Sequence, residues 1–401
     1  MAISLEDARS TIRKHITPMT ETIELNVEMV NGYVLAEDVY ARFNQPPFNR
    51  SPLDGYAFIA EDSTGANEDA PVKLSVVEEV FAGQYPSKGV MRGQATRIMT
   101  GAPIPEGANC VIRQEDTNYG ERDVEIYKTL EPFQNYCYEG EDVKAGELIL
   151  GKETKLNFLH IGMLCAQGIE RVNVYRRPKV LLITTGDEVV SYNQELSPGK
   201  IYNFSHYALK QRIADTHAEV DALHMTDNGH GVASYIAEHA DVYDLLVTTG
   251  GVSVGKKDIL HEVYEELEVE KIFWRVAVKP GSPAMFTVYK DIPIISLSGN
   301  PFATLVTYDL LVRDVLAMFL HDPSVAIQYQ DAILEDDFKK HSPGRRFVRA
   351  YYEAGKVYFP TDVHMSGAIM STANCNCFLD IPAGNRGLVK GTKVRIFKYV
   401  N

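Results

Sequence analysis

The sequence predicts a multidomain protein with a doubly wound parallel α/β sheet between residues 179 and 320, combined with smaller β-rich parts. Three apolar runs in that region, KVLLITT, YDLLVTT and IPIISLS, have the length of strands that are buried on both faces of a sheet. Segments with helical periodicity separate these runs, and such alternation is typical of a parallel sheet covered by helices. The expected helices lie at residues 205–216, 232–239, 258–267 and 301–318.

The first part of the chain predicts one helix and then a small β-rich domain. Residues 4–16 place Leu5 and Ile12 on one apolar face, which is the pattern of an amphipathic helix. Several asparagines and prolines at 44–51 mark a boundary. Short alternating strands with glycine and proline turns follow over 51–143, and this pattern favours a β-rich insert.

Two further segments flank the central region. Residues 157–167 predict a helix with Gly168 as its C-cap. After Pro323 the segments FVRAYYEAGKVYFP, NCFLDIP and KVRIFKYV alternate in polarity as strands do. They predict a small terminal barrel or sandwich.

The segment DLLVTTGGVSVGKKD at residues 244–258 has the features of a ligand-binding turn. A buried strand runs into glycines that permit positive φ and close approach of a ligand, and a helix begins at the final aspartate. Helix N-termini favour anions. The positions that matter are Gly250, Gly251, Ser253, Gly255 and Asp258. Taken alone, an ordinary strand-to-helix turn explains this segment equally well.

Two more strands end in similar turns, LLITTGDE at 181–188 and IISLSGNP at 294–301. Because the carboxyl ends of parallel strands meet at one edge, the three turns are expected to surround one crevice. Glu188, Asp227 and Asp258 each follow a predicted strand, and such oxygen ligands suit Mg²⁺ held jointly with substrate phosphates. Any one of these acids, considered separately, is more commonly a helix cap or a solvated loop residue.

Basic groups for an anion come from Lys279 and Arg275 in FWRVAVKPGSP, although two surface cations are the alternative. The residues alone therefore predict Mg²⁺-assisted chemistry on a phosphorylated or nucleotide-bearing small molecule. The sequence contains no Walker loop and no GxGxxG fingerprint, which disfavours a nicotinamide-dependent oxidoreductase.

Composition indicates which binding partners and which cellular compartment to expect. The 401 residues carry a net charge of −14, which argues against nucleic acid as a partner. No apolar run approaches the ~18 residues of a membrane span. The five cysteines and eleven histidines lack metal-ligand spacing. We therefore expect a cytoplasmic protein with reduced thiols and no structural zinc site.

Eight motifs in a fixed order indicate a family. They are SPLDGYA, MTGAPIP, CVIRQED, EGEDVKAGE, RRPKV followed by TTGDE, TTGGVSVGKKD, KPGSP and SGNP. In these motifs the chain resembles the molybdopterin molybdenumtransferases of the bacterial MoeA type, which are related to the E domain of gephyrin. The resemblance covers nearly the whole chain.

The resemblance implies four regions and a homodimer whose active site lies between protomers. The regions are an α/β molybdopterin-binding-like domain (1–25 with 178–322), a split elongated domain (26–44 with 144–177), an inserted β domain (45–143) and a C-terminal β barrel (323–401). The implied reaction is the Mg²⁺-dependent insertion of molybdate into adenylylated molybdopterin with release of AMP. The upstream molybdopterin adenylyltransferase is a candidate protein partner.

The resemblance also assigns roles to residues. The expected catalytic positions are Asp54, Thr100, Asp142, Glu188, Asp227 and Lys279, the first three from the partner protomer. The expected binding positions are Gly250, Gly251, Ser253, Gly255, Asp258, Arg275, Ser282, Gly299, Asn300, Pro301, Arg346 and Ser371. The expected Mg²⁺ ligands are Glu188, Asp227 and Asp258.

Three positions depart from the family pattern. Ser282 stands where the family has a lysine, Ser298 where it has a proline, and Ala303 where a serine is common. Loss of a charged hydrogen bond costs about 1.5–3 kcal/mol, so the site for molybdate is expected to be weakened unless another group compensates. The alternative function is a catalytically weakened paralogue that serves as a molybdopterin- or nucleotide-binding scaffold. The choice between molybdate and tungstate stays open.

Overall fold

The computed structural model describes residues 2–252, 259–360 and 365–399 and divides into two compact units. The first unit comprises Met1–Ala36, Lys155–Asn157 and Val172–Asn401, and the second comprises Glu37–Thr154 and Phe158–Arg171.

The helices of the first unit lie where helical periodicity predicts them. They are α1 (Leu5–Lys14), α3 (Phe204–Ala214), α4 (Gly229–His239), α5 (Leu260–Glu266), α6 (Pro301–Thr307) and α7 (Arg313–Phe319). Side chains cap the first turns: Ser4 accepts from the backbone of α1, and Asn203 and Asn228 do so for α3 and α4. The single helix expected at 301–318 is confirmed, with a π-helical turn between α6 and α7.

The central sheet of this unit has six strands in the order β13-β10-β14-β18-β17-β15. They are β10 (Lys179–Thr185), β13 (Glu219–Met225), β14 (Leu245–Thr249), β15 (Lys271–Trp274), β17 (Met285–Tyr289) and β18 (Ile292–Leu297). β13, β10, β14 and β18 are parallel, as predicted, while β17 and β15 extend the sheet antiparallel. The antiparallel edge was not predicted. It arises because Lys290 and Asp291 both adopt positive φ and close a two-residue hairpin between β17 and β18.

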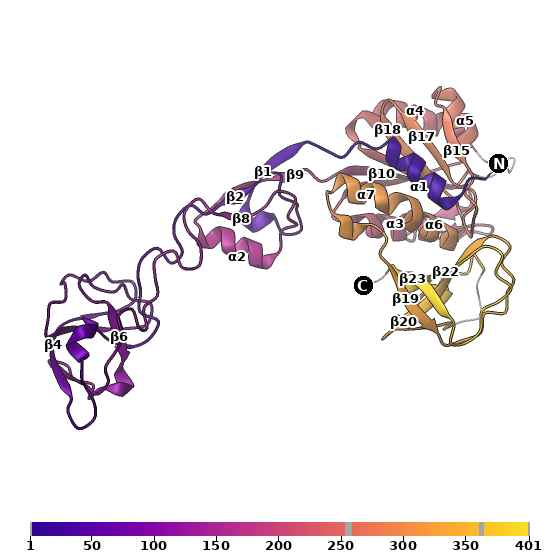
Figure 1. Ribbon diagram of the computed structural model, residues 1–401. Coiled ribbons are helices and arrows are strands. Elements are labelled where there is room, and N and C mark those ends of the chain that lie inside the picture. The colour runs from indigo at the N-terminus through magenta and orange to yellow at the C-terminus, as the bar shows by residue number, and fades with distance from the viewer. Residues whose placement is uncertain (1, 253–258, 361–364, 400–401) are drawn as a thin grey trace. The chain divides into compact units, whose positions relative to one another are not determined.

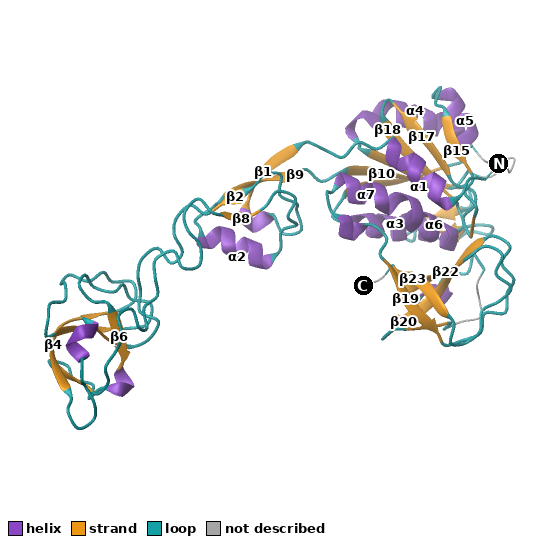
Figure 2. Ribbon diagram, in the orientation of Figure 1, coloured by secondary structure: helices purple, strands orange, loops and turns teal. Residues whose placement is uncertain are grey.

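Helices cover both faces of the sheet, and the alternation of strand side chains sets two cores (Figures 1 and 2). Leu182 on β10 faces α1, α3, α6 and α7, whereas Leu181, the preceding residue, faces α4 and α5. Both leucines are fully buried. The sheet is therefore buried on both sides, as the apolar runs of the sequence predict, and its carboxyl edge is free to carry loops.

The C-terminal segment forms a closed barrel rather than a sandwich. Its strands are β19 (Tyr329–Leu334), β20 (Arg345–Glu353), β21 (Lys356–Tyr358), β22 (Cys377–Ile381) and β23 (Lys393–Lys398). The ring closes because β20 pairs with both β21 and β22. The short strand β16 (Val278–Lys279), from the α/β region, adds to β20 in parallel. This pairing joins the barrel to the α/β region.

Two shorter strand pairs complete the first unit. β1 (Thr22–Asn26) pairs with β9 (Arg171–Tyr175), whose first residue belongs to the second unit. β11 (Val189–Val190) pairs with β12 (Ile201–Tyr202).

The second unit contains the predicted β-rich insert. Its five-stranded sheet has the order β6-β3-β5-β4-β7. The strands are β3 (Gly55–Phe58), β4 (Val72–Val80), β5 (Gln94–Ile98), β6 (Cys110–Arg113) and β7 (Asp123–Ile126). Next to this sheet in sequence are β2 (Val39–Tyr40), β8 (Leu148–Leu150) and the helix α2 (Phe158–Ala166), which matches the helix expected at 157–167.

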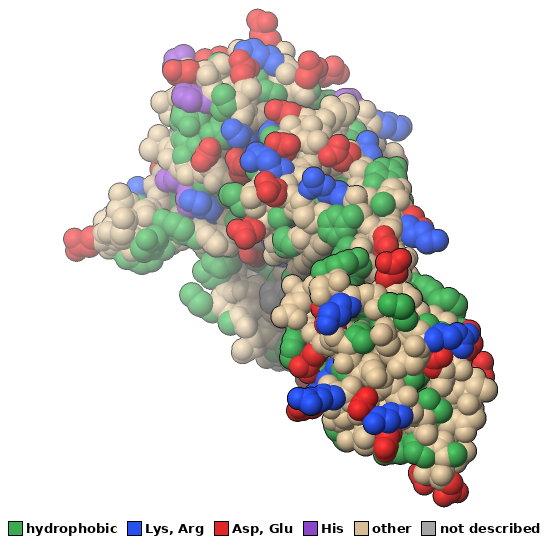
Figure 3. Space-filling model, turned by 90° about the vertical axis from the view of Figure 1, so that its left-hand side faces the viewer, with side chains coloured by type: hydrophobic (Ala, Val, Ile, Leu, Met, Phe, Trp, Pro, Cys, Tyr) green, Lys and Arg blue, Asp and Glu red, His purple; other side chains and the backbone are tan. Residues whose placement is uncertain are grey.

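The charged surface residues and the cysteine thiols are those of an ordinary globular protein. Lys, Arg, Asp and Glu side chains are interspersed on the face shown in Figure 3. All five cysteines are free thiols. Over the described ranges, no helix is long and apolar enough to cross a membrane.

We expect Gly55→Ala to destabilise the second unit by about 3 kcal/mol, because a methyl group there overpacks the strand pairing. An added Cβ would lie 1.7 Å from the carbonyl oxygen of Ile112 on the neighbouring strand β6. Hydrogen–deuterium exchange over 55–126 measures the effect, while the fluorescence of Trp274, the single tryptophan, reports the first unit. Gly162→Ala on α2 is the control, since nothing lies within 4 Å of its added Cβ. Native exchange in Gly55→Ala would contradict the prediction.

Candidate functional site

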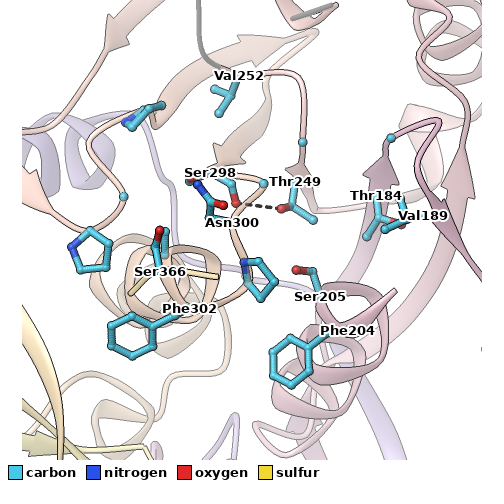
Figure 4. Close-up of a pocket in the computed structure, with 18 of the residues that line it drawn as sticks. Thr184, Val189, Phe204, Ser205, Thr249, Val252, Ser298, Asn300, Phe302 and Ser366 are labelled. Carbon is cyan, nitrogen blue, oxygen red and sulfur yellow. Dashed lines mark hydrogen bonds between the residues drawn. The ribbon is translucent and has the colours of Figure 1, made fainter. Parts of the chain in front are cut away.

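The three predicted glycine turns line one cavity at the carboxyl edge of the sheet. The turns after β10, β14 and β18 contribute Gly186, Gly250 and Gly299, among other residues, to a cavity of about 1030 Å³. Figure 4 shows residues from the three turns, among them Val189, Val252 and Asn300, around the cavity. The predicted convergence is therefore observed within the first unit.

Close backbone packing holds the turns together. Gly250 has φ +100°, and a Cβ there would lie 2.5 Å from the carbonyl oxygen of Thr185. Gly299 is packed less tightly, since its Cβ would lie 3.2 Å from the Cα of Gly250. The Thr249 hydroxyl donates to the carbonyl oxygen of Ser298 at 3.0 Å, which ties the second turn to the third (Figure 4). The three turns that form the floor of the cavity are therefore packed directly against one another.

One polar group on this floor, the Thr185 hydroxyl, has no hydrogen-bond partner in the part of the chain that the structure describes. The Thr185 hydroxyl is buried, and among the described residues it makes no hydrogen bond. A buried hydroxyl without a partner costs free energy unless a ligand or water satisfies it. Thr185 is thus a candidate ligand contact that the sequence analysis did not single out.

The acidic residues at the rim are placed by a reciprocal loop contact. Glu188 and Asp227 both line the cavity. The backbone N–H of Asp187 donates to the Asp227 carboxylate at 3.2 Å, and the backbone N–H of Asp227 donates to the Asp187 carboxylate at 3.1 Å. Asp187, next to Glu188 in the sequence, was not predicted as a site residue. It fixes the position of Asp227.

The described residues contain no group of three or more His, Cys, Asp or Glu side chains close enough to hold a metal ion. Asp258, the third expected Mg²⁺ ligand, lies outside the described residues, as do the expected binding residues Ser253 and Gly255. The two placed carboxylates, Glu188 and Asp227, fit a cation that takes one or two protein oxygens and completes its shell with phosphate and water.

The structure separates the expected basic residues. Lys279 and Arg346 line the cavity, and so do the expected binding residues Ser282, Asn300 and Pro301. Arg275 does not line it.

The guanidinium of Arg275 lies over the Trp274 ring at 4.6 Å from the ring centroid. The backbone N–H of Arg275 donates to Ala284 at 2.8 Å. These contacts give Arg275 a structural role beside the cavity. The backbone of Arg275 adopts a positive φ.

On the barrel side, the structure places a different serine at the cavity from the one expected. Ser366 lines the cavity, and its carbonyl oxygen accepts from the Phe302 N–H at 3.0 Å. Among the described residues that line the cavity, Ser371 is not included. Its hydroxyl accepts a hydrogen bond from Arg349 and donates one to the carbonyl oxygen of Ala368.

Arg349 links this segment to the cavity wall. It is fully buried, its side chain donates to the carbonyl oxygen of Met365 at 2.7 Å, and its guanidinium lies 3.7 Å from the centroid of the Phe302 ring. Burial lowers the pKa of the Arg349 side chain. No pattern in the sequence indicated this buried position.

The rim between β10 and α3 carries a polar network that the sequence analysis also missed. The strands β11 and β12 place Val189, Ile201 and Tyr202 at the cavity, followed by Asn203. Beneath them, the Asn203 amide donates to the Thr184 hydroxyl at 3.1 Å, and that hydroxyl lies 3.1 Å from Nδ1 of His224.

A second histidine, His206, approaches the Thr184 hydroxyl at 3.5 Å. Burial, together with the nearby charge of Lys210, lowers the pKa of His206, which favours its neutral form at neutral pH.

Three of the expected catalytic residues belong to the second unit. The Asp54 carboxylate accepts two hydrogen bonds of 2.7 Å from Thr100, one from its N–H and one from its hydroxyl. These bonds lower the pKa of Asp54, so the carboxylate stays ionised. Asp142 is exposed, and its N–H donates to the carbonyl of Gln45 at 3.0 Å. Asp54 and Thr100 thus form one preorganised pair, and Asp142 lies on a separate loop.

Three family models match consecutive parts of the chain. The MoeA N-terminal region (domain I and II) matches residues 3–168, a probable molybdopterin binding domain matches 181–318, and the MoeA C-terminal region (domain IV) matches 331–399. The chain is 33% identical over 398 residues to molybdopterin molybdenumtransferase of Staphylococcus epidermidis, covering 98% of this chain and 95% of that protein. The identity to the Staphylococcus aureus protein of the same name is 33% over 379 residues, covering 93% and 90%.

This chain belongs to the molybdopterin molybdenumtransferase family. The crystal structure of a molybdopterin biosynthesis protein from Pyrococcus horikosii matches it with a TM-score of 0.88 at 31% identity, over all of both chains. A molybdenum cofactor biosynthesis protein from Pyrococcus furiosus matches at 19% identity with a TM-score of 0.60, which concerns the fold alone. The multidomain α/β-plus-β fold predicted from the sequence, and the assignment to an enzyme family, are thereby confirmed.

Proposed function

We propose that this chain catalyses the Mg²⁺-dependent insertion of molybdate into adenylylated molybdopterin, with release of AMP. The observation that carries the proposal is the cavity that joins three rigid glycine turns to two carboxylates and two cations. Its volume, about 1030 Å³, suits a ligand larger than a single nucleotide. Both staphylococcal relatives are called molybdopterin molybdenumtransferase, and this name supports the choice of substrate.

The chemistry of the lining fits each part of such a substrate. Backbone around Gly250 and Gly251 and the unpartnered Thr185 hydroxyl supply polar contacts for a phosphate. Glu188 and Asp227 would hold Mg²⁺ together with phosphate oxygens, and the bound Mg²⁺ would neutralise charge on the departing AMP. The protein's own contribution is positioning, since the cavity is preorganised by packing rather than by the ligand.

The proposal includes a homodimer in which the second unit of one protomer completes the site of the other. The second unit exposes an apolar surface: Tyr40 and Leu148 are paired on β2 and β8, and Leu159 and Met163 lie one turn apart on α2. Leu159 is 60% exposed and Leu148 55% exposed. Exposed apolar clusters of this kind mark association surfaces, which supports a dimer.

Release of AMP from adenylylated molybdopterin tests the proposal. We expect turnover by the native protein that requires both Mg²⁺ and molybdate, with AMP quantified by chromatography. Omitting either ion is the matched control. Binding of the substrate without AMP release under saturating Mg²⁺ and molybdate would contradict the transferase, and would favour the scaffold reading suggested by Ser282, Ser298 and Ala303.

A further inference from the structure

A network of polar side chains anchors the cavity rim at Asn203. The Asn203 side-chain oxygen accepts from the backbone N–H of His206 at 3.0 Å and thereby caps α3. This bond fixes the orientation of the amide, so its two N–H groups are free for other acceptors. The amide nitrogen donates to the Thr184 hydroxyl at 3.1 Å and lies 3.3 Å from Nδ1 of His224. Asn203 and Thr184 are both buried, so the bond between them is shielded from water.

The backbone of Asn203 extends this anchor to the chain at the rim. Its N–H donates to the carbonyl oxygen of Val190 at 3.0 Å, and the N–H of Ile201 donates to the carbonyl oxygen of Glu188 at 2.8 Å. These bonds join β12 to β11. Glu188, Ile201 and Asn203 all line the cavity. The side chain of Asn203 therefore helps to set the position of the backbone at Glu188.

The hydrogen bonds at Asn203 fit a neutral histidine pair. Nδ1 of His224 can accept from the amide only while that nitrogen carries no proton. A proton there turns the acceptor into a donor that faces the N–H groups of the amide. The second ring, His206, places its Nδ1 3.5 Å from the Thr184 hydroxyl, so its protonation adds a positive charge to the same cluster. Histidine ordinarily titrates near pH ~6.5, within the pH range of cells.

The surroundings of His206 also favour its neutral form. Its charged and titratable neighbours are Lys210, one turn further along α3, His224 on β13, and Tyr207, whose ring centroid lies 4.9 Å away. Helix α6, which packs against the same helix, has no titratable side chain. Burial, followed by the charge of Lys210, lowers the pKa of His206. The stability that the neutral ring contributes is therefore present above about pH 6.5 and is lost as the pH falls below it.

We propose that His206 and His224 form a proton-sensitive latch on Asn203, which acts as a positioning residue for the cavity rim. With both rings neutral, the amide stays bonded to Thr184 and His224, and β12 is held in the observed position. Protonation loosens the amide, so the first turn of α3 and β12 lose their common anchor. The backbone at Glu188 then moves, whereas the glycine turns stay in place because separate contacts hold them.

Hydrogen–deuterium exchange of the full-length protein at about pH 7.5 and about pH 5.5 tests the latch, with each rate divided by the intrinsic rate at that pH. We expect the protection of the amides at 201–206 to fall about threefold to tenfold at the lower pH, the effect of one hydrogen bond. In His224→Asn the fall should be less than about twofold, because asparagine offers an acceptor close to the position of Nδ1 and does not titrate. His230→Asn alters an exposed histidine on α4 and is the matched control, expected to behave as the native protein does.

Two results would overturn the latch. One is protection at 201–206 that does not change with pH in the native protein, and the other is a native pH dependence that persists in His224→Asn. His206→Asn removes the other titrating ring, is expected to reduce the fall as well, and decides the question if His224→Asn does not fold. The fluorescence of Trp274 reports whether each variant is folded.

Turnover connects the latch to the cavity, and this part of the inference rests on the proposed function. We expect the rate of AMP release in His224→Asn, relative to native, to rise about threefold to tenfold between the higher and the lower pH. An equal ratio at both pH values would mean that the latch does not act on the cavity, which would overturn its role as a positioning device. Because exchange is measured without substrate, a lack of AMP release at every pH would contradict the transferase, while the exchange result would still decide the latch.

Discussion

Gly250→Ala is expected to lower the rate of AMP release at least about a hundredfold, because a displacement of about 1 Å at a preorganised site has that effect. The added Cβ would lie 2.5 Å from the carbonyl oxygen of Thr185 and 2.6 Å from its hydroxyl oxygen. At φ +100° a side chain is also strained. Both effects push the second turn away from the first and open the cavity floor.

The measurement is AMP release at saturating substrate, together with thermal unfolding. We expect the unfolding temperature to fall by several degrees while the protein still folds cooperatively, since overpacking at one position costs about 1–3 kcal/mol. Gly344→Ala is the control in the same unit, because nothing lies within 4 Å of its added Cβ. Native turnover in Gly250→Ala would show that contact between the turns does not set the geometry of the site.

Glu188→Gln is expected to lower turnover about a hundredfold or more, as removal of one electrostatic group from a preorganised site does. Glutamine keeps the shape of the side chain and removes the charge that would bind Mg²⁺. The concentration of Mg²⁺ required for half-maximal turnover should rise as well. Glu195→Gln, a charge change on the loop outside the cavity lining, is the control. A native Mg²⁺ requirement in Glu188→Gln would remove this residue from the metal site.

The same variant tests whether the site is shared between protomers. Glu188→Gln alters the first unit, and Asp54→Asn alters the second. If each site takes one unit from each protomer, mixed dimers contain one unaltered site, and co-expression of the two variants in equal amounts should restore about a quarter of native turnover. Turnover no greater than that of either variant alone would mean that each site is built within one chain.

The central sheet and its helices were predictable because their signals are local. Apolar runs such as KVLLITT fit the interior of a parallel sheet, and the amphipathic pattern at 4–16 locates the first helix to within a few residues. The glycines after β14 were equally informative, since the close approach to Thr185 leaves no room for a side chain at Gly250. The family resemblance then supplied the proposed substrate, which no local pattern contains.

The antiparallel edge of the sheet was not predictable from such signals. Lys290 and Asp291 adopt positive φ without the glycine that usually marks a two-residue hairpin. The π-helical turn at Tyr308–Val312 likewise interrupts a sequence that is continuously helical in pattern.

The sequence by itself determined the family, the order of the elements and the convergence of three glycine turns on one cavity. The tertiary structure decided which side chains reach that cavity. Ser366 lies there and Ser371 does not, and Arg346 stands beside Lys279 because β16 adds to the barrel strand β20. Such contacts join residues that are far apart in the chain, so their register depends on how the barrel closes and packs, a property of the whole fold rather than of any segment.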